Sequence, residues 1–140
     1  VADGAARVLA AREDWDVLLV DGYDAHSIVE ALASAEFYAA ARRALKVGGL
    51  AVFNLWGSDR YFDTYLARIE HAFAQRTLIL PAERRGNIQV FAHSGDRPLP
   101  DMKTLHTRAQ AWDDRLGLGF DRFVDRLRDF NPTLSARAPR

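Results

Sequence analysis

The sequence predicts an α/β domain built on a mostly parallel sheet, and three observations carry this prediction. Short, uninterrupted apolar runs such as Val17–Val20 are typical of strands buried on both faces. Segments with apolar residues at helical spacing separate these runs, and such alternation favours parallel strands joined by right-handed crossovers. Two further short runs, 77–80 and 88–92, are joined by only the five residues 82–86, so we expect the last strand to be antiparallel.

The individual elements follow from local signals. Ser34 can cap a helix that Gly48-Gly49 would close, and Ser58 can cap the next helix. Gly117 and Asn131-Pro132 mark the ends of two later helices. The expected order is a helix over 4–12, a strand over 17–20, a helix from 34 to 48, a strand over 50–55, a helix from 58 to 73, strands over 77–80 and 88–92, and helices over 102–116 and 120–127.

Composition limits the class of protein. The 140 residues are 49% hydrophobic and 27% charged, which indicates one folded domain. The 19 basic and 19 acidic residues balance, so no net charge attracts nucleic acid or an anionic membrane. No apolar run approaches the roughly 18 residues of a membrane helix. The absence of cysteine excludes disulfides and Cys-based zinc sites and fits a reducing compartment. Taken together, these observations lead us to expect a soluble, cytoplasmic protein with no nucleic-acid or membrane partner.

The chain divides at an irregular segment. The run from Ser94 to Pro100 is rich in Gly, Pro and Asp and breaks regular structure. We therefore expect residues 1–94 to form the sheet domain and residues 95–140 to form a helical C-terminal extension. The first residue is Val1, where an intact reading frame would give Met, so we expect a fragment.

Candidate site residues lie where strands end, because ligands of open parallel sheets bind beyond the carboxyl ends of the strands. Asp21 and Asp24 follow the first strand, and Asn54 lies at the end of the second. Asp3-Gly4 stands directly before a helix. Each also has a structural interpretation, as a turn residue, a helix cap or a partner of loop backbone. The four histidines lack metal-ligand spacing, so we expect no metal site.

An ordered set of residues runs through the first 93 positions. It comprises Asp3-Gly4, Asp21-x-x-Asp24, Glu30-x-Leu32, Glu36-Phe37-Tyr38, Leu45, Gly49, Asn54, Pro81 and Gly86-Asn87-Ile88. This set resembles the catalytic domain of the spermidine synthases, which are polyamine aminopropyltransferases. The resemblance implies the C-terminal part of a class I methyltransferase-like Rossmann sheet, mostly parallel with its last strand antiparallel, with two appended C-terminal helices.

The resemblance also implies roles for individual residues. Asp21 corresponds to the catalytic proton acceptor, while Asp24 and Asn54 correspond to residues that bind the amine substrate. Asp3 corresponds to the residue that holds the adenine amino group, with Gly4 close to the base.

Two more positions, Gly22 and Ile28, correspond to residues that lie against the nucleoside. The implied co-substrate is decarboxylated S-adenosylmethionine or S-adenosylmethionine, with no metal cofactor. The implied partners are a small-molecule amine such as putrescine and this nucleoside, and the resemblance allows a homodimer.

Departures from the family pattern keep two alternatives open. The family usually has a proline directly after the second Asp and a Gly-Pro pair further on, whereas this chain has Ala25, Ser27 and Ile28. Glu83 stands where an aromatic residue of the family lines the amine tunnel. The family's glycine-rich turn and ribose-binding acid precede the position of Val1. The alternatives are an S-adenosylmethionine-dependent methyltransferase with another acceptor and a non-catalytic remnant of the fold, and we expect the isolated fragment to be inactive.

Three geometric expectations follow from the predicted topology. The strand ending at Val20 should lie beside the strand from Leu50, parallel to it. Its outer edge should be unpaired, and an edge this apolar promotes association. The side chains of Asp21, Asp24 and Asn54 should meet in one cleft, with the Asp-Gly pair at 3–4 on the nucleoside side.

Overall fold

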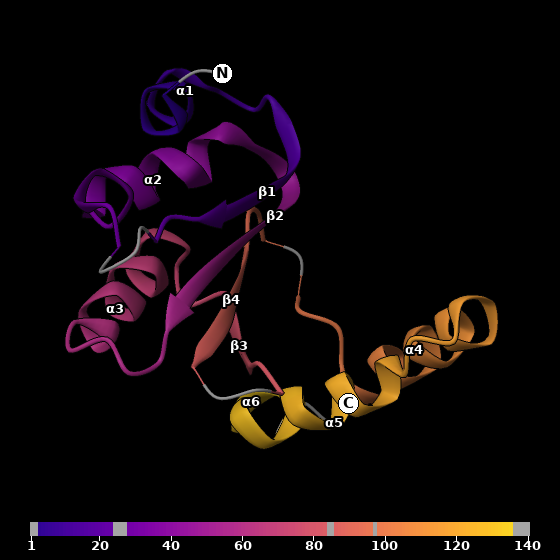
Figure 1. Ribbon diagram of the computed structural model, residues 1–140. Coiled ribbons are helices and arrows are strands. Elements are labelled where there is room, and N and C mark those ends of the chain that lie inside the picture. Colours follow the sequence, from indigo (N-terminus) through magenta and orange to yellow (C-terminus); the bar gives the residue numbers. More distant parts are fainter. Residues whose placement is uncertain (1–2, 24–27, 84–85, 97, 136–140) are drawn as a thin grey trace.

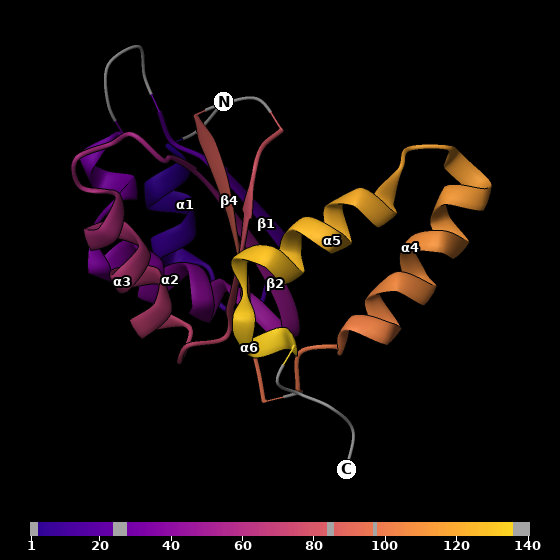
Figure 2. The same ribbon diagram turned by 90° about the horizontal axis from the view of Figure 1, so that it is seen from below.

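The structure is a computed structural model that describes residues 3–23, 28–83, 86–96 and 98–135. Its elements are α1 (Gly4–Ala10), β1 (Trp15–Asp21), the 3-10 helix η1 (Glu30–Leu32), α2 (Ala35–Ala44), β2 (Leu45–Trp56), α3 (Phe62–Ala72), β3 (Thr77–Pro81), β4 (Asn87–His93), α4 (Met102–Leu116), α5 (Phe120–Phe130) and α6 (Pro132–Ser135). The strands form one sheet in the order β1-β2-β4-β3. Helices α1, α2 and α3 lie along one face, and α4, α5 and α6 lie on the other side, where α5 contacts β3 (Figures 1 and 2).

The sheet has the predicted topology. β1 and β2 are parallel, with Val20 opposite Phe53. β4 is antiparallel to both of its neighbours, β2 and β3, so three strands run one way and the last runs the other. In the described part of the chain β1 pairs with β2 alone, and its outer edge is unpaired as predicted.

One predicted helix ends earlier than expected. α2 begins as predicted, because the Ser34 side chain accepts a hydrogen bond of 3.0 Å from a backbone N–H of its first turn. It ends at Ala44, however, and Leu45 already pairs with Trp15 in the sheet. The prediction that the glycine pair 48–49 closes this helix is wrong, because pairing with the neighbouring strands extends β2 back to residue 45.

The cap expected for the following helix is also wrong. α3 begins at Phe62, after Tyr61 and not after Ser58, and none of the described side chains caps it. The end predicted for α4 is confirmed, because Gly117 adopts a left-handed conformation with φ 63°, which glycine reaches at little cost.

The core fills the space between the sheet and helices α1 to α3. Phe53 on β2 meets Tyr38 of α2 edge-on, with ring centroids 5.2 Å apart, and it meets Phe73 edge-on at 6.0 Å. Ile69 of α3 and Val90 of β4 are fully buried beside them. This packing holds β1, β2 and β4 in fixed register, which positions the side chains at their ends.

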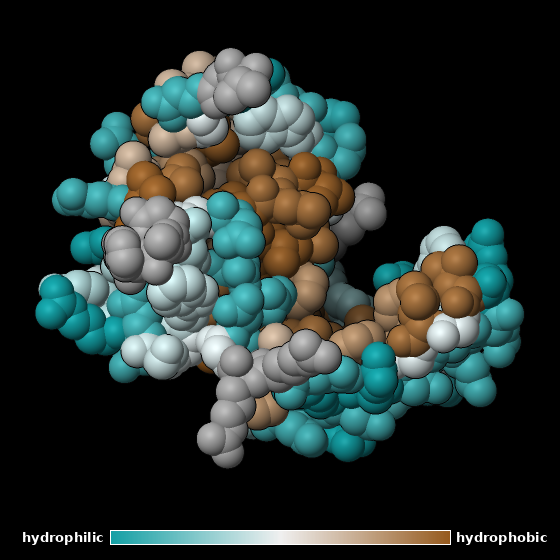
Figure 3. Space-filling view, in the orientation of Figure 1, coloured by the Kyte–Doolittle hydropathy of each residue, from teal (hydrophilic) through white to brown (hydrophobic). Residues whose placement is uncertain are grey.

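The opposite face of the sheet carries apolar side chains that stay exposed. Val17 is 56% exposed and Leu19 is 73% exposed, and Figure 3 shows apolar side chains gathered over this part of the molecule. On β3 the same face is covered by the C-terminal helices, since Leu78 is 5% exposed.

The division of the chain into a sheet domain and a helical extension at residue 94 stays a prediction. Among the described helices, none is both long enough and apolar enough to cross a membrane.

Candidate active site

Three polar side chains stand in register across neighbouring strands. Asp21, the last residue of β1, lies opposite Asn54 of β2, which lies opposite Gln89 of β4. The amide Nδ2 of Asn54 donates to Oδ1 of Asp21 at 3.1 Å, and Nε2 of Gln89 donates to Oδ1 of Asn54 at 2.8 Å. We call these three residues the polar row. The expected proximity of Asp21 and Asn54 is confirmed, whereas their roles stay predictions.

The negative charge of Asp21 has no cationic partner among the described residues. Across residues 3–23, 28–83, 86–96 and 98–135, no ion pair within 4.0 Å involves its carboxylate, and the side chain is exposed. Glu83, by contrast, is held by Arg122 at 3.0 Å. The polar row therefore offers an exposed carboxylate, braced by an amide, to a positively charged ligand.

A cavity of about 510 Å³ adjoins the polar row at Gln89. Its remaining walls come from the β3–β4 hairpin and α5, and they are formed by Leu80, Pro81, Ala82, Glu83 and Phe123. The carboxylate of Glu83 is already paired with Arg122, so this cavity offers mainly apolar walls and the Gln89 amide, which suit the methylene groups of a ligand whose charge lies at Asp21.

Asp3 has a structural role in this structure. Its Oδ1 accepts hydrogen bonds from the backbone N–H groups of Ala5, at 2.9 Å, and Ala6, at 3.1 Å, so it caps α1. Both bonds end on Oδ1, which leaves Oδ2 for a ligand. A β-carbon at Gly4 would meet no atom within 4 Å, so the space beside it is open. Asp24 lies outside the described residues.

Gly22 and Ile28 pack the segment that follows β1. A β-carbon at Gly22 would lie 2.8 Å from Cδ1 of Leu32, and the Gly22 carbonyl accepts a 2.8 Å bond from the N–H of Val29. Ile28 is buried and pairs with Tyr23 in an isolated bridge. Both residues contribute to the packing of this segment, and their contact with a nucleoside stays a prediction.

An aromatic pair ties the ends of β1 and β2 together. The rings of Tyr23 and Trp56 stack with centroids 4.4 Å apart. The backbone N–H of Trp56 also donates to the Tyr23 hydroxyl oxygen at 3.0 Å. Burial raises the pKa of Tyr23, so the phenol stays neutral. Beside the pair a cavity of about 940 Å³ reaches α3, with Asp59, Tyr61 and Tyr65 among its walls.

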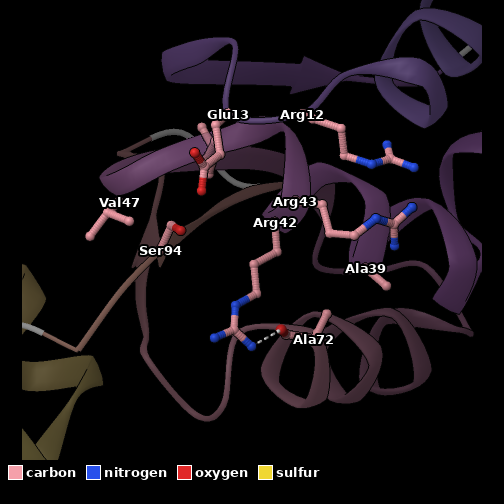
Figure 4. Close-up of a pocket in the computed structure, with 9 residues that line it drawn as sticks. Arg12, Glu13, Ala39, Arg42, Arg43, Val47, Ala72 and Ser94 are labelled. Carbon is pink, nitrogen blue, oxygen red and sulfur yellow. Dashed lines mark hydrogen bonds between the residues drawn. The ribbon is translucent and has the colours of Figure 1, made fainter.

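A third cavity lies at the other end of the sheet. It measures about 610 Å³ and contains Arg12, Arg42 and Arg43 (Figure 4). Arg42 donates to the carbonyl of Ala72 at 3.1 Å, and Arg12 donates to the carbonyl of Ala11 at 2.6 Å. Two of these three arginines thus bind carbonyls at helix ends, and the cavity lies where β2 begins, away from the polar row.

Gln89 is the site residue that sequence reasoning missed. The signal was a single polar residue between two apolar ones, Ile88 and Val90, in a predicted strand. Alternation along a strand places Gln89 on the face opposite the buried Val90. In the described part of the chain, no three His, Asp or Glu side chains are grouped to hold a metal ion.

Comparison with known proteins agrees with the resemblance stated above. No protein-family model matches the chain. The polyamine aminopropyltransferase of Chromobacterium violaceum is 37% identical over 130 residues, which cover 93% of this chain and 50% of that enzyme. Those of two Neisseria meningitidis strains, of serogroups A and B, are 35% identical over 131 residues, covering 94% of this chain and 50% of each enzyme. A match of 130 residues is longer than the first 93, so it reaches into the helical part.

Solved structures of spermidine synthases share this fold. One, in complex with the transition-state analogue AdoDATO, has a TM-score of 0.60 at 23% identity over 75% of this chain and 39% of that chain. A probable spermidine synthase from Corynebacterium glutamicum has a TM-score of 0.63 at 22% identity over 85% of this chain and 44% of that chain. The chain spans about half the length of the curated relatives it matches. The chain is thus homologous, over nearly all its length, to about half of a polyamine aminopropyltransferase, and it has the corresponding part of the spermidine synthase fold.

Proposed function

We propose that this chain provides the amine-binding side of an aminopropyltransferase site, with Asp21 as its central residue. The observation that carries the proposal is the exposed carboxylate of Asp21, braced at 3.1 Å by Asn54 at the carboxyl edge of the sheet. A polyamine is a flexible cation. A carboxylate with no cationic partner among the described residues, in a polar row that reaches a partly apolar cavity at Gln89, matches its charge and its methylene chain.

The proposed reaction is a displacement at carbon. The amine nitrogen of the acceptor forms a bond to the aminopropyl carbon of decarboxylated S-adenosylmethionine, and the bond from that carbon to the sulfonium sulfur breaks. The bonding pair stays on sulfur, which leaves as a neutral thioether, so no acid is needed. At neutral pH the acceptor nitrogen is an ammonium with no free electron pair, so it must lose one proton before or during the attack.

Asp21 contributes by holding and orienting the amine and by receiving this proton. Direct transfer from an alkyl ammonium to an ordinary carboxylate is uphill by about 9 kcal/mol, from reference pKa values near 10.4 and 3.9. Because Asp21 is exposed, water can carry the proton onward. Under the same proposal Asp24 holds the distal ammonium of the acceptor, and Gly22 and Ile28 lie against the nucleoside.

Asp3 holds the adenine amino group in this proposal. Since its Oδ1 caps α1, replacement by alanine would remove the cap together with the nucleoside contact. Asp3→Asn is the cleaner variant, because an amide oxygen still caps the helix. The variant replaces Oδ2, the oxygen left for the adenine amino group, with an NH₂ group that cannot accept from it, so nucleoside affinity should fall while the free energy of unfolding stays near that of the parent.

The test is an assay of group transfer. A chimera in which this chain replaces the matching residues of the Chromobacterium violaceum relative is given putrescine with decarboxylated S-adenosylmethionine. Asp21→Asn should lower kcat by about 10²- to 10⁴-fold, the usual contribution of general acid–base catalysis. Nucleoside affinity, measured by calorimetry, should stay near that of the parent chimera.

Asp16→Asn is the matched control. Asp16 lies on the same strand, is exposed, and pairs with Lys46 at 2.8 Å at the far end of β1, so this variant should keep its turnover. Near-normal turnover of Asp21→Asn would refute the proposed role of that carboxylate. Methyl transfer from S-adenosylmethionine in place of aminopropyl transfer would support the methyltransferase alternative.

A further inference from the structure

We infer that Gln89 is a positioning residue, which fixes the amide of Asn54 so that its NH₂ group faces Asp21. The inference rests on the proposed function, because it concerns the carboxylate assigned to the amine. Its basis is the chain of two hydrogen bonds, 2.8 Å from Gln89 to Asn54 and 3.1 Å from Asn54 to Asp21, on three strands in register.

The direction of these bonds follows from donor and acceptor chemistry. An ionised carboxylate only accepts hydrogen bonds, so Asp21 requires the NH₂ group of Asn54. The carbonyl oxygen of Asn54 then points the other way, where Gln89 meets it with a donor. If Asn54 turned over, its oxygen would face the carboxylate and its NH₂ group would face the NH₂ group of Gln89. The contact with the carboxylate would become unfavourable, and the contact with Gln89 would survive only if that amide turned over as well. The bond from Gln89 is thus a second hydrogen bond that a turn of Asn54 must break, which restrains Asn54 in the orientation that Asp21 requires.

This orientation matters for the proposed chemistry. The bond from Asn54 ends on Oδ1 of Asp21, which leaves Oδ2 for the amine. A carboxylate held in one orientation keeps the attacking nitrogen aligned with the carbon, whereas a rotating one does so only part of the time. Loss of Gln89 should therefore lower kcat without changing nucleoside affinity, since the residue lies on the side of the hairpin cavity.

The first test needs no enzymatic activity. Nuclear magnetic resonance of the 140-residue chain reports the side-chain NH₂ signals of Asn54 with and without Asp21→Ala. In the parent chain, Asp21→Ala should shift these signals, because the NH₂ group loses its acceptor. Gln89→Glu has the same size but offers only acceptors when ionised, so it should draw the NH₂ group away from Asp21. In the Gln89→Glu background, the shift caused by Asp21→Ala should disappear.

Two further variants complete the design. Gln110→Glu makes the same change at an exposed position of α4 and should leave the response of Asn54 as in the parent chain. Gln89→Leu removes the donor without adding charge, and it should reduce the response in the same direction if Gln89→Glu does not fold. An undiminished response in whichever Gln89 variant folds would overturn the inference.

The second test measures kinetics in the chimera. Gln89→Glu should lower kcat about tenfold, equivalent to about 1.4 kcal/mol, with unchanged nucleoside affinity. Unchanged kcat together with a lost Asn54 response would overturn the positioning role, because orientation would then not affect the reaction. Failure of the proposed function is distinguishable, since the parent chimera would then show no aminopropyl transfer while the resonance test still decides the role of Gln89.

Discussion

Replacement of Asn131 by alanine should detach the C-terminal helices from the edge of the sheet. Asn131 follows α5 and is 7% exposed. Its Oδ1 accepts from the N–H of Ile79 at 2.8 Å, and its Nδ2 donates to the carbonyls of Ile79 and Leu127, both at 2.7 Å. The side chain thus pairs with both backbone groups of one β3 residue, as a residue of a neighbouring strand would.

The expected loss follows from these three bonds. A typical hydrogen bond in a protein contributes about 0.5–1.5 kcal/mol net, so three give about 1.5–4.5 kcal/mol. Asn131→Asp is a control of equal size. It keeps the acceptor for the N–H of Ile79 but sets a carboxylate oxygen against two carbonyls, so it should destabilise the chain at least as much as Asn131→Ala at neutral pH.

Urea unfolding followed by circular dichroism measures the free energy of unfolding for the three chains. Hydrogen exchange at the amide of Ile79 reports the bond itself, and exchange should accelerate in Asn131→Ala. A loss below about 0.5 kcal/mol with unchanged exchange at Ile79 would refute the reasoning, because the bonds would then contribute less than one ordinary hydrogen bond.

Two other predictions concern buried polar groups. The hydroxyl of Tyr38 is buried without a partner among the described residues, and burial raises its pKa, so Tyr38→Phe should stabilise the chain by about 0.5–1 kcal/mol in thermal or urea unfolding. A loss of stability would show that the hydroxyl has a partner. Burial, and then the charge of Arg76, lower the pKa of His93 below 6.5, so the unfolded chain binds its proton more readily. The contribution of His93 to the free energy of unfolding should be constant above pH about 6.5 and should be lost as the pH falls from there through the lower folded-state pKa. Urea midpoints measured across this pH range should therefore fall less for His93→Gln than for the parent chain.

Much of the fold could be predicted because its signals are local or follow from short connections. The apolar run 17–20 identified β1, and the five-residue link between the last two strands indicated their antiparallel pairing. The end of α2 could not be predicted in the same way. Gly48-Gly49 is a valid helix stop, but the pairing of Leu45 with Trp15 depends on residues 30 positions apart and ends the helix sooner.

The candidate site could also be predicted only in part, because Asp21 and Asn54 follow from the sequence and Gln89 does not. Asp21 and Asn54 each follow from the rule that ligands lie beyond the ends of parallel strands, and the parallel pairing of those strands brings them together. Gln89 lies on an antiparallel strand, whose register against β2 is determined by packing across the sheet. No local sequence pattern predicts the register of β4 against β2, so the contact between Gln89 and Asn54 could be found only in the structure.

The polar row joins residues that are 33 and 35 positions apart in the chain, and only the alignment of three strands holds them together. The connecting segments can therefore change length, as long as each strand keeps its alignment. A slip of β2 by a single residue, in contrast, would put Phe53 or Leu55 in the place of Asn54 and turn the amide to the other face of the sheet. Insertions in the links and insertions within the strands thus carry opposite risks for this chain. A variant library should place its length changes between strands and never inside them.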